Sequence, residues 1–154
     1  MNNTDSFSTI RETARRLNEA VDDLNSVIKA FERQLINSHI GIECWLNDED
    51  CHLTETDLKE DGESGPRFIA TILGFARVSD PEARWRLAIK TQSWRSDAEG
   101  KSVCVERDPT PLVDASRTAR LNAVGLFDLL REQLIAEGES FLDDINEAKK
   151  KLAA

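Results

Sequence analysis

The sequence is poor in the residues on which most catalytic and metal sites depend. It contains only two histidines, and its three cysteines, Cys44, Cys51 and Cys104, do not have the paired spacing of a structural zinc site. Glycine-rich phosphate loops, a Gly-x-Ser-x-Gly elbow and a His-Glu-x-x-His helix are all absent. We therefore expect a protein that is not an enzyme and needs no cofactor or metal.

Long apolar runs are also missing. No stretch is long enough to span a bilayer, and the first residues, Met-Asn-Asn-Thr-Asp, lack the basic and then apolar order of a signal peptide. These features predict a cytoplasmic protein with no membrane partner. In that compartment an odd number of cysteines predicts reduced thiols rather than disulfides.

The negative charge is concentrated in one part of the chain. Residues 39–66 hold nine acidic side chains and one basic side chain, Lys59, out of a total net charge of −9. The rest of the chain is close to neutral, and the overall pI is about 4.8. Because polyanion binding needs a basic surface, we expect no nucleic-acid partner.

The acidic residues predict a long solvated loop over residues 47–66. An EF-hand counted from Asp57 would place Lys59 and Phe68 at its third and twelfth positions, where oxygen ligands are required, so the calcium motif fails. One alternative is that residues 48–63 imitate the phosphate backbone of a nucleic acid and act on a basic partner. A regulator of this kind would compete with DNA for binding to the basic partner, and this competition would distinguish it from a protein with a merely solvated acidic loop.

Two long segments carry the three- and four-residue spacing of an amphipathic helix. The first covers about residues 5–37, and the second covers about residues 111–152, with Thr110 as its predicted N-cap and Pro111 as its first residue. The first stripe consists of Phe7, Ile10, Ala14, Leu17, Val21, Leu24, Ile28, Phe31 and Leu35. A stripe this long has to be buried against other helices.

Between these helices the period changes to the two-residue alternation of strands. Strands are predicted over about residues 39–46, 67–78, 84–94 and 102–106. The third of them places Trp85, Leu87 and Ile89 on one face and its basic residues and Trp94 on the other. We expect Trp85 to be buried and Trp94 to be partly exposed.

The predicted fold is a single α+β domain over residues 1–154. A helical hairpin (residues 1–38 and 109–154) of two long antiparallel coiled-coil-like helices flanks an antiparallel meander of three to four strands (residues 39–108). The order of elements is similar to that of prefoldin subunits, although no sequence motif is shared. Because one hairpin cannot bury two wide stripes, we expect a homodimer whose seam contains Leu17, Leu24, Ile28, Phe31, Phe127, Leu130 and Leu134.

These features indicate a protein-interaction module, an adaptor or chaperone-like protein that binds an unidentified protein through its sheet. The predicted binding residues are Trp94, Arg84, Arg86 and Lys90, because aromatic and arginine side chains dominate interface energetics. The same mixture also occurs on platforms for single-stranded nucleic acid, but the acidic pI opposes that use. The alternative from a different class is a metal- or thiol-dependent protein with a site around Cys44, Cys51 and His52.

Overall fold

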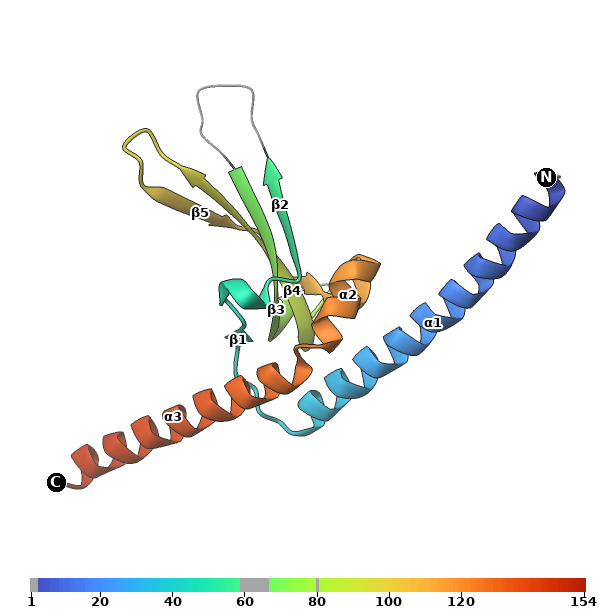
Figure 1. Cartoon of the computed structure of the whole chain (residues 1–154). Helices are drawn as coiled ribbons and strands as arrows, with labels where there is room; N and C mark the ends of the chain where they lie inside the picture. The colour runs from blue at the N-terminus through green and yellow to red at the C-terminus, as the bar shows by residue number, and fades with distance from the viewer. Residues whose placement is uncertain (1–2, 59–66, 80) are drawn as a thin grey trace.

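The computed structural model describes residues 3–58, 67–79 and 81–154. It contains long helices at both ends of the chain and an antiparallel sheet between them, so the predicted α+β class is confirmed (Figure 1). In chain order the elements are α1 (Asn3–Asn37), β1 (Cys44–Trp45), the 3₁₀ turn η1 (Glu49–Cys51), β2 (Thr54–Leu58), β3 (Arg67–Ser79), β4 (Ala83–Ser96), β5 (Ser102–Glu106), β6 (Thr110–Pro111), the 3₁₀ turn η2 (Leu112–Asp114), α2 (Arg117–Val124) and α3 (Phe127–Ala153).

The centre of the sheet is the hairpin of β3 and β4. These strands pair in one unbroken register from Phe68 opposite Trp94 to Ser79 opposite Ala83. The other edge of β3 pairs with β1 and β2, and the other edge of β4 pairs with β5 and β6. The predicted strands over residues 67–78, 84–94 and 102–106 are confirmed, with ends that differ by at most two residues.

Two predicted boundaries within the sheet region are wrong. The strand expected over residues 39–46 is reduced to β1, because His39 and Gly41 have positive φ angles of 55° and 52° that interrupt an extended backbone. The loop expected over residues 47–66 contains η1 and β2 before it reaches residues 59–66, which lie outside the described residues. Burial of Cys51 and Leu53 holds this part of the segment against the sheet.

The second long helix begins later than expected. Thr110 and Pro111 do not start a helix, because they pair with Ile89 and Ala88 as the strand β6. Ser116 is the actual N-cap of α2, and its side chain accepts a hydrogen bond from the backbone N–H of Ala119. The helical run then breaks at Gly125 and Leu126, and α3 continues as a separate helix.

The core lies where one face of the sheet meets the inner parts of the helices. Leu73, Phe75 and Leu87 face this core from β3 and β4, and all three side chains are at most 1 % exposed. Ile28 of α1 and Leu130 of α3 reach it from the helices and are completely buried. The sheet, α2, the first turns of α3 and the last turns of α1 together form the body of the molecule, which contains this core.

The expected antiparallel packing of the two long helices is not confirmed. Both helices run in the same general direction in Figure 1, so the N-terminus and the C-terminus lie at opposite ends of the molecule. They meet near the body, where the rings of Phe31 and Phe127 stack with centroids 4.3 Å apart. Beyond this contact each helix projects as a free arm, and among the described residues neither arm packs along the other.

Gly74 allows a close crossing that holds β1 against the sheet. The indole of Trp45 lies directly over Gly74, and a Cβ atom at that position would overlap the ring and the carbonyl oxygen of Cys44. The same indole donates a hydrogen bond of 2.7 Å to Glu43. Gly74 is therefore a packing requirement of this sheet.

Gly74→Ala should destabilise the protein by about 1–3 kcal/mol, because the added methyl group forces Trp45 away from the sheet. Chemical denaturation followed by circular dichroism measures this change. Gly125→Ala is the matched control, since Gly125 has right-handed helical angles and no neighbour closer than 3.5 Å to the added carbon. A Gly74→Ala variant as stable as Gly125→Ala would disprove this packing role.

Candidate functional site

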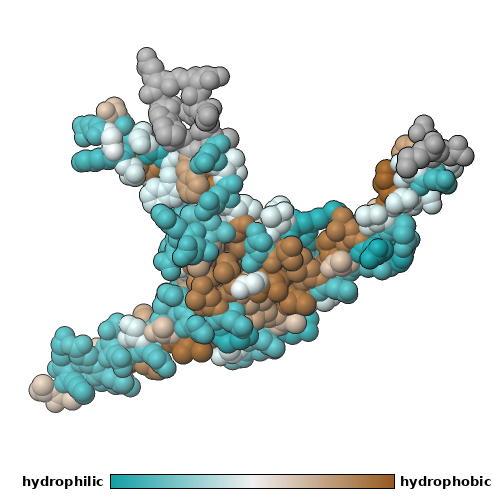
Figure 2. Space-filling model, in the orientation of Figure 1, coloured by the Kyte–Doolittle hydropathy of each residue, from teal (hydrophilic) through white to brown (hydrophobic). Residues whose placement is uncertain are grey.

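The apolar stripe of α1 belongs to the core at one end and is exposed at the other. Ile28, Phe31 and Leu35 are buried in the body, whereas Phe7 is 61 % exposed and Ile10 is 58 % exposed. Figure 2 shows the apolar surface continuing from the body outward along one side of α1. An exposed apolar stripe that continues from a core is therefore a candidate interaction surface.

The structure divides the predicted dimer seam into two groups. Ile28 and Phe31 of α1, together with Phe127, Leu130 and Leu134 of α3, are buried inside the single chain. Leu24 packs partly against the same core, and Leu17 is 45 % exposed on the free arm. Only the outer part of the predicted seam is therefore available to another molecule.

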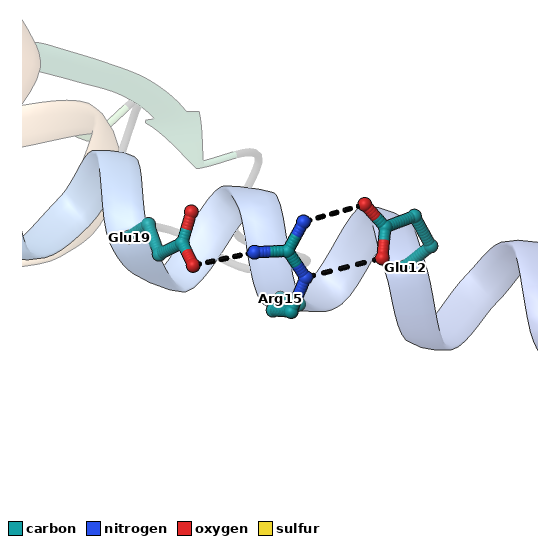
Figure 3. A network of polar contacts seen from close by, with 3 residues as sticks. All are labelled: Glu12, Arg15 and Glu19. Atoms are coloured by element: carbon teal, nitrogen blue, oxygen red, sulfur yellow. Dashed lines mark hydrogen bonds and ion pairs between the residues drawn. The ribbon is translucent and has the colours of Figure 1, made fainter.

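The opposite face of the α1 arm is polar, and its charged side chains form hydrogen bonds with one another within the helix. The guanidinium of Arg15 donates to Glu12 at 2.7 Å and to Glu19 at 2.6 Å, and it lies between the two carboxylates (Figure 3). The hydrogen bond with Arg15 lowers the pKa of Glu12, and those with Glu12 and Glu19 raise the pKa of Arg15. Such an exposed network identifies the side of the arm that stays in water.

The α3 arm borders a separate apolar cavity. This cavity of about 790 Å³ lies between α3 and the segment 38–43 that leads into β1, and its apolar lining includes Ile40, Ile42, Ile135, Phe141, Leu142 and Ile145. Gly138 faces Ile40 and Ile42, and a Cβ atom there would lie 3.7 Å from each. These are ordinary van der Waals distances, so the packing of the connecting segment on α3 would also accept an alanine at this position.

Two of the predicted basic binding residues are engaged in holding the fold. The guanidinium of Arg86 lies 3.4 Å from Glu32 of α1, which also accepts a hydrogen bond of 3.0 Å from the backbone N–H of Leu87. The ammonium of Lys90 lies 3.3 Å from Glu106 and 4.4 Å from the ring centroid of Trp45. Both side chains tie elements together rather than standing free.

The predicted binding residues are also spread along the strand instead of forming one patch. Arg84 is exposed near the start of β4, with its nearest carboxylate, that of Glu82, at 3.6 Å. Trp94 lies on the same face ten residues later, which corresponds to about 33 Å of extended strand. The structure therefore does not bring Arg84 and Trp94 together.

Trp94 instead lines a cavity that sequence reasoning missed. It lies opposite Phe68 on the neighbouring strand and is 36 % exposed. The cavity beside it has a volume of about 450 Å³ and is lined by Asn47, Glu49, His52, Phe68, Gln92, Trp94 and Ser102. The alternation of β3 and β4 was the one sequence signal that could have placed Phe68 and Trp94 opposite each other.

Polar groups around this cavity are held in place by hydrogen bonds. Nδ1 of His52 lies 2.7 Å from Glu55, and the His52 ring is 5.9 Å from that of Phe68. The side chain of Gln92 donates to Glu106 at 2.9 Å, which lowers the pKa of that carboxyl, with a further contribution from Lys90. The cavity thus combines two aromatic side chains with polar side chains, several of which are held by hydrogen bonds.

The cysteines do not form a reactive centre. Burial, with a contribution from Glu137, raises the pKa of the Cys44 thiol to about 12, and burial also raises the pKa values of Cys51 and Cys104. All three thiols are free. Among the residues that the structure describes, no three His, Cys, Asp or Glu side chains are grouped so that they could hold a metal ion.

Cys44 should be almost inert toward iodoacetamide near neutral pH. A rise in pKa from 9.0 to about 12 lowers the fraction of reactive thiolate roughly a thousandfold. Mass spectrometry after timed labelling should find Cys104, the most exposed of the three, modified before Cys44 in the folded protein. In urea the three rates should converge, and equal rates in the folded protein would contradict this assignment.

Models of protein families, curated proteins and solved structures all fail to match this chain significantly. Within the described part of the chain, no helix combines the length and apolarity needed to cross a membrane.

Proposed function

We propose that this protein is a non-enzymatic interaction module, an adaptor or chaperone-like protein that assembles as a homodimer through its helical arms. The single observation that carries this proposal is the exposed outer half of the α1 stripe. Fully burying a large apolar side chain contributes about 1.5–3 kcal/mol. Phe7, Ile10 and Leu17 are 61, 58 and 45 % exposed, so burying them in two copies contributes about half of this value for each side chain, toward a cost of association of about 4–15 kcal/mol.

A second copy is the simplest occupant of the α1 stripe. The stripe is long and narrow, and a helix of matching apolar spacing covers such a surface best. Another copy always provides that helix at equal concentration, and a twofold dimer needs only one self-complementary surface. The polar network on the other side of α1 leaves one helix face free for the partner.

We further propose that the sheet binds a protein partner through the cavity beside Trp94. This proposal moves the predicted binding site away from Arg86 and Lys90, whose charges are taken up by Glu32 and Glu106. Trp94 and Phe68 supply the aromatic part of this otherwise polar cavity, where a side chain of the partner would bind. Burial raises the pKa values of all three thiols, which gives no support to thiol chemistry.

Leu17→Asp should weaken self-association by about a hundredfold or more, because the dimer would bury an unpaired carboxylate. Analytical ultracentrifugation at micromolar concentration should show a dimer for the wild type and a monomer for the variant. The variant chain should still fold, since Leu17 makes no contact with the core. Leu130→Asp is unsuitable for this test because Leu130 is completely buried within the body.

Ser8→Asp is the matched control for this experiment. It places the same charge on the polar face of the same arm and should leave the dimer intact. A wild-type protein that sediments as a monomer would refute the proposed assembly. An unchanged dimer in Leu17→Asp would move the interface away from α1.

Trp85→Ala should mainly lower the stability of the protein, whereas Trp94→Ala should mainly weaken binding of a partner. Trp85 is only partly buried, but it packs against the core and stacks on Phe75 with centroids 5.4 Å apart, so its loss should cost about 1–3 kcal/mol of stability. Trp94→Ala should cost less than about 1 kcal/mol, because the ring lines an open cavity. In affinity capture from the native host, Trp94→Ala should lose proteins that the wild type and the exposed-site control Val105→Ala retain. Similar destabilisation by both tryptophan changes, with capture unchanged, would restrict the sheet to a structural role.

A further inference from the structure

We infer that the cavity beside Trp94 binds an arginine side chain of the partner protein. This inference rests on the proposed binding of a partner through the sheet, and it names the chemistry that the partner supplies. It is carried by the groups that the strand register places around Trp94 and Phe68.

The register of the sheet places two aromatic side chains on one face. Phe68 of β3 lies opposite Trp94 of β4, and residues directly opposite in antiparallel strands point to the same face. The ring of His52 lies 5.9 Å from that of Phe68 and also lines the cavity. The face of an aromatic ring attracts a cation, and the indole of tryptophan does so most strongly.

The outer strands surround these rings with carboxylates. β2 and β5 rise from the body away from both helical arms (Figure 1). Asp57 of β2 lies opposite Phe68, and Glu106 of β5 lies opposite Gln92. Glu55 lies two residues before Asp57 in β2 and therefore points to the same face. Acidic side chains thus lie on both sides of the aromatic pair.

The negative charge of this face is only partly neutralised within the chain. Glu106 is paired with a lysine whose ammonium lies 3.3 Å away, and Glu55 lies 2.7 Å from Nδ1 of His52. The side chains of Asp57 and of Glu49, which lines the cavity, form no ion pair with a described residue. Among the described residues that line the cavity there is no lysine or arginine. The surroundings of Trp94 are therefore acidic.

The polar groups that line the cavity offer hydrogen-bond acceptors. An ionised carboxylate only accepts, so Nδ1 of His52 carries the hydrogen in its bond with Glu55, and Nε2 of the neutral ring is left as an acceptor. Gln92 is 7 % exposed, and donation by its amide N–H to Glu106 leaves its carbonyl oxygen as an acceptor. Together with the carboxylate of Glu49, these acceptors come from separate elements and converge on one cavity.

An arginine side chain matches this combination of rings and acceptors. Its guanidinium is always charged, carries five N–H donors and no acceptor, and stacks flat on an aromatic face while its N–H groups point outward in the plane. A lysine ammonium attracts the same groups but cannot stack flat. A neutral aliphatic side chain would leave the acceptors unpaired, and an acidic side chain would meet like charges. The net charge of −9 further favours the approach of a basic partner.

Titration with short capped peptides of the form Gly-Xaa-Gly tests this inference. Xaa is arginine, its uncharged isostere citrulline, lysine or glutamate, and the ionic strength is held constant because salt screens exposed charges. The readout is the indole N–H signal of Trp94 in the NMR spectrum of the full-length protein, identified by its disappearance in Trp94→Phe. The signal of Trp85, which packs against the core, is the internal reference.

The arginine peptide should shift the Trp94 signal saturably, with a Kd in the millimolar range that is typical of a single side chain. The lysine peptide should bind several-fold more weakly because it loses the flat stacking contact. The citrulline and glutamate peptides should give no saturable shift, and the Trp85 signal should not move.

Neutralising the acidic side chains should weaken this binding. Glu49→Gln and Asp57→Asn should each raise the Kd of the arginine peptide about two- to fivefold, as the loss of an exposed ion pair does. Glu132→Gln is the matched control, since Glu132 is exposed on α3 and does not line the cavity. Thermal unfolding checks that each variant is folded. The same loss of affinity in Glu132→Gln would indicate general attraction to an acidic protein and overturn the inference.

The remaining outcomes separate this inference from the proposed function. Citrulline or lysine peptides that bind as tightly as the arginine peptide would overturn the assignment to a guanidinium. Free arginine that binds more tightly than the capped peptide would overturn the assignment to a partner protein. Loss of captured proteins in Trp94→Ala without any shift by the arginine peptide would overturn this inference and leave the proposed partner site standing. Unchanged capture by Trp94→Ala, with no shift from any peptide, would overturn both.

Discussion

Burial of the inner end of α1 is the constraint on which the rest of the molecule depends. Ile28, Phe31 and Leu35 occupy the core together with residues from β3, β4 and α3. The carboxylate of Glu32 in the same helical turn accepts a hydrogen bond from the backbone of β4. With its last turns held in this way, an unbroken helix of 35 residues must project from the body, and its stripe must leave the core with it.

The same constraint explains why one continuous pattern has two physical roles. The stripe of α1 keeps its spacing from Phe7 to Leu35, but the body is large enough to cover only its inner half. The outer half of the stripe packs against no other part of the same chain, so its apolar side chains are exposed to water. An arrangement of this kind is stable in solution when a second surface covers the stripe, which is the physical basis of the proposed dimer.

Charged side chains show how strongly context decides the use of a residue. Arg86 and Lys90 look like parts of a basic surface on one strand face, yet Glu32 from α1 and Glu106 from β5 lie next to them. A tryptophan from β1 adds a cation–π contact to Lys90. These partners come from elements that are distant in sequence, so the basic character of β4 is used for cohesion and little of it remains for recognition.

The sequence by itself determined the class of the fold and the local type of most elements. The alternation in β3 and β4 and the long stripe of α1 are local patterns, and each follows from the repeat of a single element. Local sequence patterns gave wrong predictions for segments whose composition is not typical of strands but which pair with a neighbouring strand. The polar segment Thr54–Leu58 resembles a loop, but backbone hydrogen bonds to β3 make it a strand, and Thr110–Pro111 resembles a helix start but pairs with β4.

Only the tertiary structure decided the direction of the helices and the surfaces left free. Apolar spacing shows that a helix has a partner, but the same spacing fits parallel, antiparallel and intermolecular pairing. The stacking of Phe31 on Phe127 joins the inner ends of the two arms, and the register of β3 and β4 places Phe68 opposite Trp94 at the cavity on the sheet. Both arrangements join residues distant in the chain, and they are chosen by the packing of the whole body rather than by any local repeat.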